Sequence, residues 1–227
     1  MLPKFTDKAF LPYGRQCIED DDIASVVEGL KSDFLTGGPT VDAFEVELAR
    51  CTDAAHAIAV SSGTAALNLA TIALELGPGD VAIVPTMTFL ATANAALHAG
   101  AEVEFADVDS ETGLLTPETL HEALDRTEHN ARVVLPVHLN GQTVDLSAIS
   151  KVTGFENLRV IEDACHALGG HYTGQNDHMV PVGSNAYADM SVFSFHPVKT
   201  LTMGEGGAIT TNDSKLAERL RRLSNIG

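Results

Sequence analysis

The chain contains little cysteine: only three of its 227 residues, Cys17, Cys51 and Cys165, are of this type. They are too few and too scattered for a disulfide framework or a cysteine-based metal site. The nine histidines show no convincing ligand spacing, so no metal site is predicted. A reduced, cytoplasmic setting is expected from this cysteine usage.

Basic residues are also scarce, since 14 lysines and arginines face 31 acidic residues and give a formal net charge of −17. A surface of this sign repels the phosphates of nucleic acids and the headgroups of anionic lipids. We therefore expect neither a nucleic-acid partner nor a membrane partner. A solubilising surface is the simplest interpretation of the charge.

Long apolar runs are absent. Nowhere do about 18 apolar residues follow one another without interruption, so no membrane span is predicted. The first residues, MLPKFTDKAFLPYGRQ, lack a basic region followed by an apolar core, and no signal peptide is expected. A hydrophobic content of 44% in 227 residues supports one sizeable core rather than two full-size domains.

What the sequence does contain is an alternation of short apolar strands with helices. Residues 1–18 are expected to form an irregular arm, broken by Pro3, Pro12 and Gly14. Strands are predicted over 57–60, 81–85, 102–109, 131–137, 158–164, 187–195 and 207–211. Helices are predicted over 19–31, 41–51, 63–76, 88–100 and 145–153, and beginning near Thr116 and Asn212.

This order predicts an α/β fold with a mainly parallel mixed sheet between helices. Ligands in such folds bind at the carboxyl ends of the strands. We expect one domain over residues 19–227 behind the arm. Because the chain stops after LRRLSNIG, in a helix or just beyond one, the sequence suggests a fragment.

The first motif with chemical content is SSGTAAL, residues 61–67. It follows a buried strand and opens a helix, so free backbone amides and the helix dipole favour a phosphate there. Gly63 lets the backbone approach a ligand, and Thr64 adds a hydroxyl. A plain strand-to-helix turn is the alternative interpretation.

The second motif is VIEDACHALGG, residues 160–170, which places two acids at the end of an apolar strand. Asp163 is suited to face a cationic ring nitrogen, although it could instead cap a helix. Glu162 could be a partner that supports the site residues or a simple strand-end acid, and the second interpretation is favoured. His166 lies three residues further on and could also be a core histidine.

The third motif is SVFSFHPVKTLTMGEGG, residues 191–207. Ser194 and Lys199 lie five positions apart around the point where Pro197 breaks an apolar strand. A lysine that enters the interior is costly unless it is neutralised or bonded. An imine with an aldehyde cofactor satisfies that requirement, whereas a solvated loop lysine is the alternative.

Together and in this order, the three motifs resemble the sugar-nucleotide aminotransferases of the DegT/StrS group. The resemblance covers nearly the whole chain, from PYGRQ at 12–16 to the last helix. It implies the large domain of a fold type I aminotransferase that binds pyridoxal 5′-phosphate (PLP), without the small C-terminal domain. PYGRQ, PVHLNGQ and SFHPVKT are most similar to C4-aminotransferases of pseudaminic acid biosynthesis, which act on a UDP-linked 4-keto-6-deoxy-N-acetylhexosamine.

The resemblance also implies roles for individual residues. Lys199 would form an imine with PLP, and Asp163 would pair with its pyridine nitrogen. His166 would reach the phenolic oxygen of the ring, and Phe89 would stack on the ring face unless it is an ordinary core residue. The phosphate would be held by Gly63, Thr64 and Ser194. Tyr13, Arg15, His196 and residues 33–37 are candidates for contacts with the substrate.

The implied reaction moves an amino group from L-glutamate to a UDP- or dTDP-linked keto sugar, in a homodimer with shared active sites. Three alternatives stay open. The first is another PLP enzyme of the group, with a different keto sugar or a dehydratase activity, although dehydratase relatives carry histidine where Lys199 stands. The second is a cofactor-binding or regulatory module without turnover. The third, a nucleotide-binding oxidoreductase, lacks the expected G-x-G-x-x-G turn.

Overall fold

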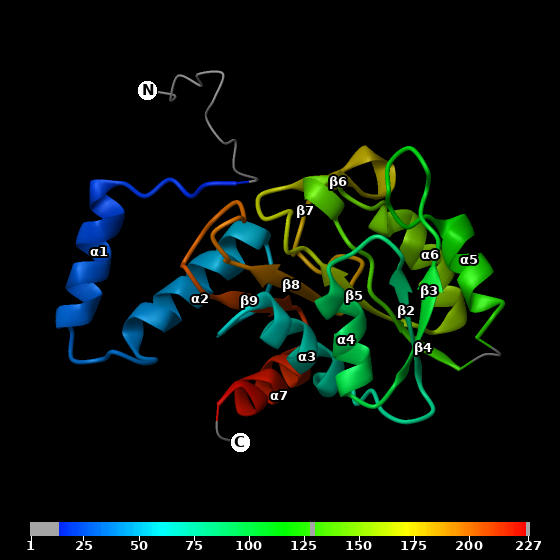
Figure 1. The fold of residues 1–227 in the computed structure, drawn as a ribbon, viewed down its shortest axis with the longest axis horizontal. Helices are drawn as coiled ribbons and strands as arrows, with labels where there is room; N and C mark the ends of the chain where they lie inside the picture. Colours follow the sequence, from blue (N-terminus) through cyan, green and yellow to red (C-terminus); the bar gives the residue numbers. More distant parts are fainter. Residues whose placement is uncertain (1–13, 128–129, 226–227) are drawn as a thin grey trace, which may run out of the picture.

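A computed structural model describes residues 14–127 and 130–225 of the chain (Figure 1). Its centre is a seven-stranded sheet with the order β1-β9-β8-β5-β4-β2-β3. The strands are β1 His56–Val60, β2 Val81–Pro85, β3 Glu102–Ala106, β4 Ala131–Val134, β5 Arg159–Asp163, β8 Met190–Ser194 and β9 Gly207–Thr211. Strand β9 pairs antiparallel with both β1 and β8, and the other pairs are parallel.

Helices cover both faces of this sheet. One buried cluster joins the sheet to α3 Gly63–Ala73, α4 Leu90–His98 and α7 Ser214–Ser224. The cluster on the other face includes residues of α2 Pro39–Thr52, α5 Pro117–Leu124 and α6 Leu146–Glu156. Successive strand residues alternate between the clusters: Val160 packs on the α6 side and Ile161 on the α3 side. The layers explain why the strands are apolar on both faces.

The predicted fold class is therefore confirmed, and so is each predicted strand, although several are shorter than expected. The sequence analysis missed a separate hairpin, formed by β6 His171–Thr173 and β7 Met179–Pro181. It also missed two short 3₁₀ turns, Leu139–Gly141 and Gln175–Asp177. Each of these elements is only three residues long, which is too short for a periodic pattern.

Helix α1, Asp20–Lys31, forms as predicted but buries none of its residues within the described chain. Its apolar positions Ile23, Val26 and Leu30 are 54%, 63% and 68% exposed. Figure 1 shows the helix standing apart from the sheet, beyond the end of α2. The helical spacing of these residues was read correctly, but it does not pack α1 against this domain. Among the residues described, no helix is both long and apolar enough to span a membrane.

The direction of the strands decides where a ligand can bind. Strands β1, β2, β5 and β8 run the same way, so their last residues lie along one edge of the sheet. Helices α3 and α4 begin shortly after β1 and β2 end, and their N-termini lie at the same edge. The three sequence motifs therefore meet there, as expected for ligand sites in parallel sheets.

Candidate active site

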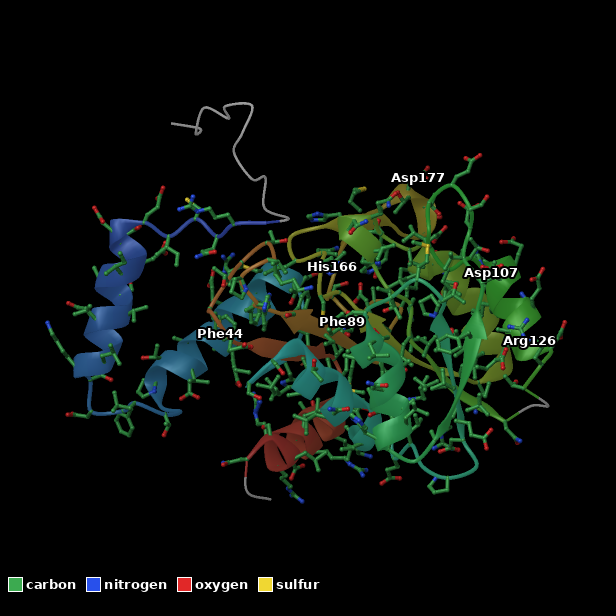
Figure 2. The ribbon with its side chains drawn as sticks, in the orientation of Figure 1. Phe44, Phe89, Asp107, Arg126, His166 and Asp177 are labelled. Carbon is green, nitrogen blue, oxygen red and sulfur yellow. The ribbon has the colours of Figure 1, made fainter. Side chains whose placement is uncertain are left out.

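A cavity of about 570 Å³ opens at this edge of the sheet. Its walls come from five segments of the chain that are far apart in sequence. They include Ser62, Gly63, Thr64, Leu67, Thr88, Phe89, Ala91, Val137, Leu139, Asn140, Asp163, Cys165, His166, Ser194, His196, Val198, Lys199 and Glu205. Figure 2 shows Phe89 and His166 near the middle of the molecule.

The first wall of the cavity is the N-terminus of α3. Ser62 caps the helix, since its Oγ accepts a hydrogen bond of 3.1 Å from the amide of Ala65. The amides of Gly63 and Thr64 lie in the first turn, where the helix itself supplies no acceptor. With the half-buried Ser194 beside them, these groups form a site suited to an anion.

Gly63 is needed at this wall for steric reasons. A Cβ atom at this position would lie 2.8 Å from Cβ of Ser194 and 3.2 Å from the sulfur of Cys165. The start of α3 therefore lies against the end of β8 with no space for a side chain. This close approach brings the Ser194 hydroxyl next to the helix N-terminus.

We predict that Gly63→Ala weakens anion binding in the cavity by roughly tenfold or more, because the helix start must shift away from Ser194. Titration with inorganic phosphate and with PLP measures the effect. Gly154→Ala is the matched control, since a Cβ at this helical glycine meets nothing within 4 Å. It should leave binding unchanged and stabilise α6 slightly. Equal affinities in the two variants would contradict the prediction.

The opposite wall holds the carboxylate of Asp163, which is 4% exposed. Its Oδ2 accepts a hydrogen bond of 2.8 Å from the hydroxyl of Thr92, and its Oδ1 accepts one of 3.2 Å from the amide of Cys165. No helix follows β5 directly, so the helix-cap interpretation of Asp163 is wrong. A buried carboxylate held in this way is suited to face a cation in the cavity.

Lys199 lines the same cavity and is half-buried. It lies in the turn after β8, where its amide donates to the carbonyl oxygen of His196 over 2.9 Å. Its positive charge lowers the pKa of His166, to a smaller extent than burial does. The lysine is therefore not a fully solvated loop residue, and its charge acts on groups inside the cavity.

His166 is held in one tautomer by the backbone of the 139–141 turn. The amide of Asn140 donates to Nδ1 of His166 over 3.2 Å, so Nδ1 carries no proton and Nε2 does. Burial, followed by the charge of Lys199, lowers the pKa of His166. The histidine is thus a neutral hydrogen-bond donor at neutral pH, and it lines the cavity instead of the core.

The lowered pKa of His166 predicts a pH dependence of stability. The unfolded chain binds a proton at this residue more readily than the folded chain, so stability is lost as the pH falls below about 6.5. His166→Gln removes this contribution. The drop in Tm of the cofactor-free protein between pH 7.5 and pH 5.5, roughly spanning the histidine range, should be smaller in the variant. An equal or larger drop would contradict the assignment.

Phe89 is 70% exposed and caps the start of α4, so the interpretation as an ordinary core residue is wrong. Its ring lies at the cavity, together with the exposed His196. Arg15 and residues 33–37 are not among the described residues that line the cavity. Tyr13 lies outside the described residues.

Thr92 and Asn140, which hold the side chains of Asp163 and His166, were not predicted from the sequence, and Glu162 was given the wrong role. Glu162 is not a simple strand-end acid. It is fully buried on the other face of β5, where it accepts hydrogen bonds from His138 over 2.7 Å and from the amide of Gly183 over 3.2 Å. A carboxylate surrounded by apolar strands could have signalled such partners, because a buried charge requires them.

Comparison with known proteins agrees with this geometry. Residues 16–227 match the DegT/DnrJ/EryC1/StrS aminotransferase family. The chain is 42% identical to the spore coat polysaccharide biosynthesis protein SpsC of Bacillus subtilis, over 96% of this chain and 54% of that protein. It is 39% identical to the UDP-4-amino-4-deoxy-L-arabinose–oxoglutarate aminotransferase of Shewanella sediminis, over 96% of this chain and 53% of that enzyme.

Solved structures give the same result. The form of a sugar aminotransferase from Streptococcus pneumoniae that contains pyridoxamine 5′-phosphate (PMP) superposes with a TM-score of 0.85 and 30% identity. The match covers 95% of this chain and 57% of the pneumococcal chain. Helicobacter pylori PseC, an aminotransferase of pseudaminic acid biosynthesis, superposes with a TM-score of 0.83 and 30% identity, over 93% and 54% of the two chains.

The fold is thus that of the sugar aminotransferases that use PLP. The chain belongs to the DegT/DnrJ/EryC1/StrS aminotransferase family. It spans about half the length of the curated relatives that it matches.

The residues present fit this cofactor. A phosphate suits the N-terminus of α3, where the amides of Gly63 and Thr64 lie at the cavity together with the hydroxyl of Ser194. The buried carboxylate of Asp163 suits a protonated ring nitrogen, and Lys199 opens into the same cavity. An anion site, a buried carboxylate and an amine in one cavity match the three ends of PLP that a protein must hold.

Proposed function

We propose that this chain is the cofactor-binding part of an aminotransferase that uses PLP and acts on a nucleotide-linked keto sugar. The observation that carries the proposal is the convergence of Lys199, Asp163 and the N-terminus of α3 on one cavity. Family membership and the aminotransferase relatives support it. The carboxylate of Asp163 and the amine of Lys199 lie on side chains from different strand ends, so only the fold brings them together.

When bound, PLP withdraws electrons from the carbon atom next to the transferred nitrogen. Lys199 would hold the aldehyde group of the cofactor through its amine. When not engaged in this bond, Nζ of Lys199 would act as the general base that takes the proton from the α-carbon of the amino donor. The carboxylate of Asp163 holds the proton on the ring nitrogen, because its negative charge favours the cationic form.

The remaining residues bind and orient. Nε2 of His166 donates a hydrogen bond to the phenolic oxygen of the ring. The amides of Gly63 and Thr64 bind the phosphate together with the hydroxyl of Ser194. Phe89, exposed at the cavity, packs on one face of the ring. His196, Arg15 and Tyr13 are proposed for contacts with the sugar nucleotide.

For the substrates, we propose L-glutamate as donor and a UDP- or dTDP-linked 4-keto-6-deoxy sugar as acceptor. The Shewanella relative is named for a UDP-linked 4-amino sugar and for oxoglutarate, the keto acid of glutamate. PseC and SpsC are named for pseudaminic acid and for spore coat polysaccharide biosynthesis. These names support C4 amination for a surface glycan, with pseudaminic acid biosynthesis as the specific pathway proposed.

We further propose that residues 19–227 form the large PLP-binding domain of a cytoplasmic homodimer with shared active sites; most of the arm expected over residues 1–18 lies outside the described residues. The coverage of about half of the relatives' length agrees with a domain that works together with further chain. The exposed apolar side of α1 agrees with burial outside the described domain.

The test is a pair of half-reactions with the complete gene product and PLP. L-Glutamate alone should convert bound PLP to the pyridoxamine form, followed by absorbance, and release 2-oxoglutarate. A panel of UDP- and dTDP-linked 4-keto sugars should then restore the first form and yield amino sugars, detected by mass spectrometry. If PLP binds but no amino acid converts it, the aminotransferase proposal fails and a module without turnover is favoured.

A further inference from the structure

Thr92 lies in the first turn of α4 and is completely buried. Its Oγ1 donates a hydrogen bond of 2.8 Å to Oδ2 of Asp163, on the neighbouring strand β5. A second hydroxyl, that of Thr88, lies 2.7 Å from the same Oγ1. Because the single proton of Thr92 goes to the carboxylate, the Thr88 hydroxyl donates to Thr92. The two threonines and Asp163 thus form a directed chain of hydrogen bonds.

The partner of Thr92 sets it apart from the other buried threonines in the described helices. Thr52 in α2, Thr71 in α3 and Thr153 in α6 each have a carbonyl oxygen of their own helix as hydrogen-bond partner, and Thr71 also lies 3.2 Å from the carbonyl oxygen of Ala95 in α4. This is the usual local bond of a helical threonine. The hydroxyl of Thr92 instead reaches a carboxylate 71 positions away in the sequence.

The geometry fixes the orientation of the Asp163 carboxylate. Thr92 bonds one oxygen from the side of α4, and the amide of Cys165 bonds the other over 3.2 Å from the chain that follows β5. A carboxylate held at both oxygens from two different elements cannot rotate about its last bond without losing a donor. Its free lone pairs therefore keep one direction toward the cavity.

Thr92 itself does not line the cavity, whereas Thr88 and Asp163 do. Its hydroxyl therefore acts on a ligand only through the carboxylate. We propose that Thr92 is a positioning residue, which aligns the carboxylate of Asp163 with the ring nitrogen of the cofactor. This inference rests on the proposed function, and it deepens it by adding a residue to the site.

The test uses three variants of the complete gene product: Thr92→Val, Thr92→Ser and the control Thr71→Val. Valine keeps the shape of threonine and removes the hydroxyl. Thr71 is equally buried, and its hydroxyl lies 2.9 Å from the carbonyl oxygen of Asn68 and 3.2 Å from that of Ala95 in α4, both of which lie outside the cavity. The measurements are Tm without cofactor, the dissociation constant of PLP, and the rate constant and KM of the glutamate half-reaction.

We expect Thr92→Val to raise the dissociation constant of PLP roughly tenfold, the effect of losing one hydrogen bond to a charged group. The rate constant of the half-reaction should fall by at least as much, with little change in KM for glutamate. Thr92→Ser should restore both values to within about threefold, because serine supplies the same donor. Thr71→Val should lower Tm about as much as Thr92→Val and leave PLP binding unchanged.

Equal PLP affinities in Thr92→Val and Thr71→Val would overturn the proposal, since Thr92 would then be only a structural residue. Failure of serine to rescue binding would overturn it as well, because the hydroxyl would not be the active group. If the wild-type protein did not bind PLP at all, the proposed function would be contradicted, and this inference, which rests on it, would be contradicted as well. Measuring the wild-type protein alongside the variants keeps these failures distinguishable.

Discussion

Replacement of Lys199 by alanine should abolish the visible absorption band that a lysine bonded to PLP produces. The variant should still bind the cofactor, because the anion site at α3 and the carboxylate of Asp163 remain. The glutamate half-reaction should slow by at least about 10³-fold, since a positioned general base alone contributes roughly 10² to 10⁴. Absorbance spectra and single-turnover release of 2-oxoglutarate measure the two effects.

Lys215→Ala is the matched control. Lys215 begins α7 near the opposite edge of the sheet, is exposed, and lies outside the cavity. Its loss should change neither the band nor the half-reaction. Reduction with borohydride followed by peptide mapping adds a direct check: the label should appear on Lys199 in the wild type. A persistent band in Lys199→Ala, with the label on another lysine, would refute the assignment.

The sequence predicted most of this site because its parts lie next to periodic signals. Asp163 and Ser194 end apolar strands, and Gly63 opens a helix directly after one. A parallel sheet sends such residues to a single edge, so motifs that lie far apart in the sequence are expected to meet there without any knowledge of contacts. The structure adds that Lys199 opens into the same cavity, which the sequence could express only as a resemblance.

The sequence could not show the residues that act across the fold. Thr92 looks like any threonine in an apolar helix, and only the structure reveals that its hydroxyl bonds Asp163. Asn140 contributes a backbone amide to His166, and no side-chain pattern records an amide. The role of Glu162 was predicted wrongly for a related reason. Its hydrogen-bond partner His138 lies 24 positions earlier, in the connection that follows β4.

Helix α1 shows that a correctly predicted helix does not reveal what its apolar side packs against. Its apolar spacing predicts a helix, and the helix forms, but its apolar side chains stay exposed within the described chain. Periodicity reports that a surface is apolar and not which surface covers it. The same holds for Phe89, whose aromatic side chain suggested the core as one alternative and is 70% exposed at the cavity. In both cases the apolar side chain lies outside the core of the domain.

Asp163→Asn should separate the charge of this residue from its shape. Asparagine keeps the size of the side chain and an oxygen that accepts the proton of Thr92, but it no longer offers a negative charge to the ring nitrogen. The rate constant of the glutamate half-reaction should fall by about 10² to 10³, as for the loss of one electrostatic group in a preorganised site. Single-turnover kinetics of the protein loaded with PLP measure the change.

The free energy of unfolding of Asp163→Asn shows whether its slower half-reaction comes from lost chemistry or from a damaged structure. In the cofactor-free protein, asparagine removes a buried charge, which is favourable, and leaves the amide of Cys165 without an acceptor, which is unfavourable. These effects oppose each other, so the free energy of unfolding should change by no more than about 1 kcal/mol. Denaturant unfolding of the variant checks this expectation.

Asp189→Asn is the control for Asp163→Asn, because it also removes a carboxylate that bonds β5, at the opposite end of the strand. The carboxylate of Asp189 accepts a hydrogen bond of 2.7 Å from the amide of Val160 and lies outside the cavity. Asparagine there should leave the half-reaction within about twofold of the wild type, since surface charge changes rarely act at this distance. If Asp163→Asn kept a similar rate while binding PLP normally, the charge at position 163 would have no part in the reaction, and the carboxylate would serve only to anchor Thr92 and the chain after β5.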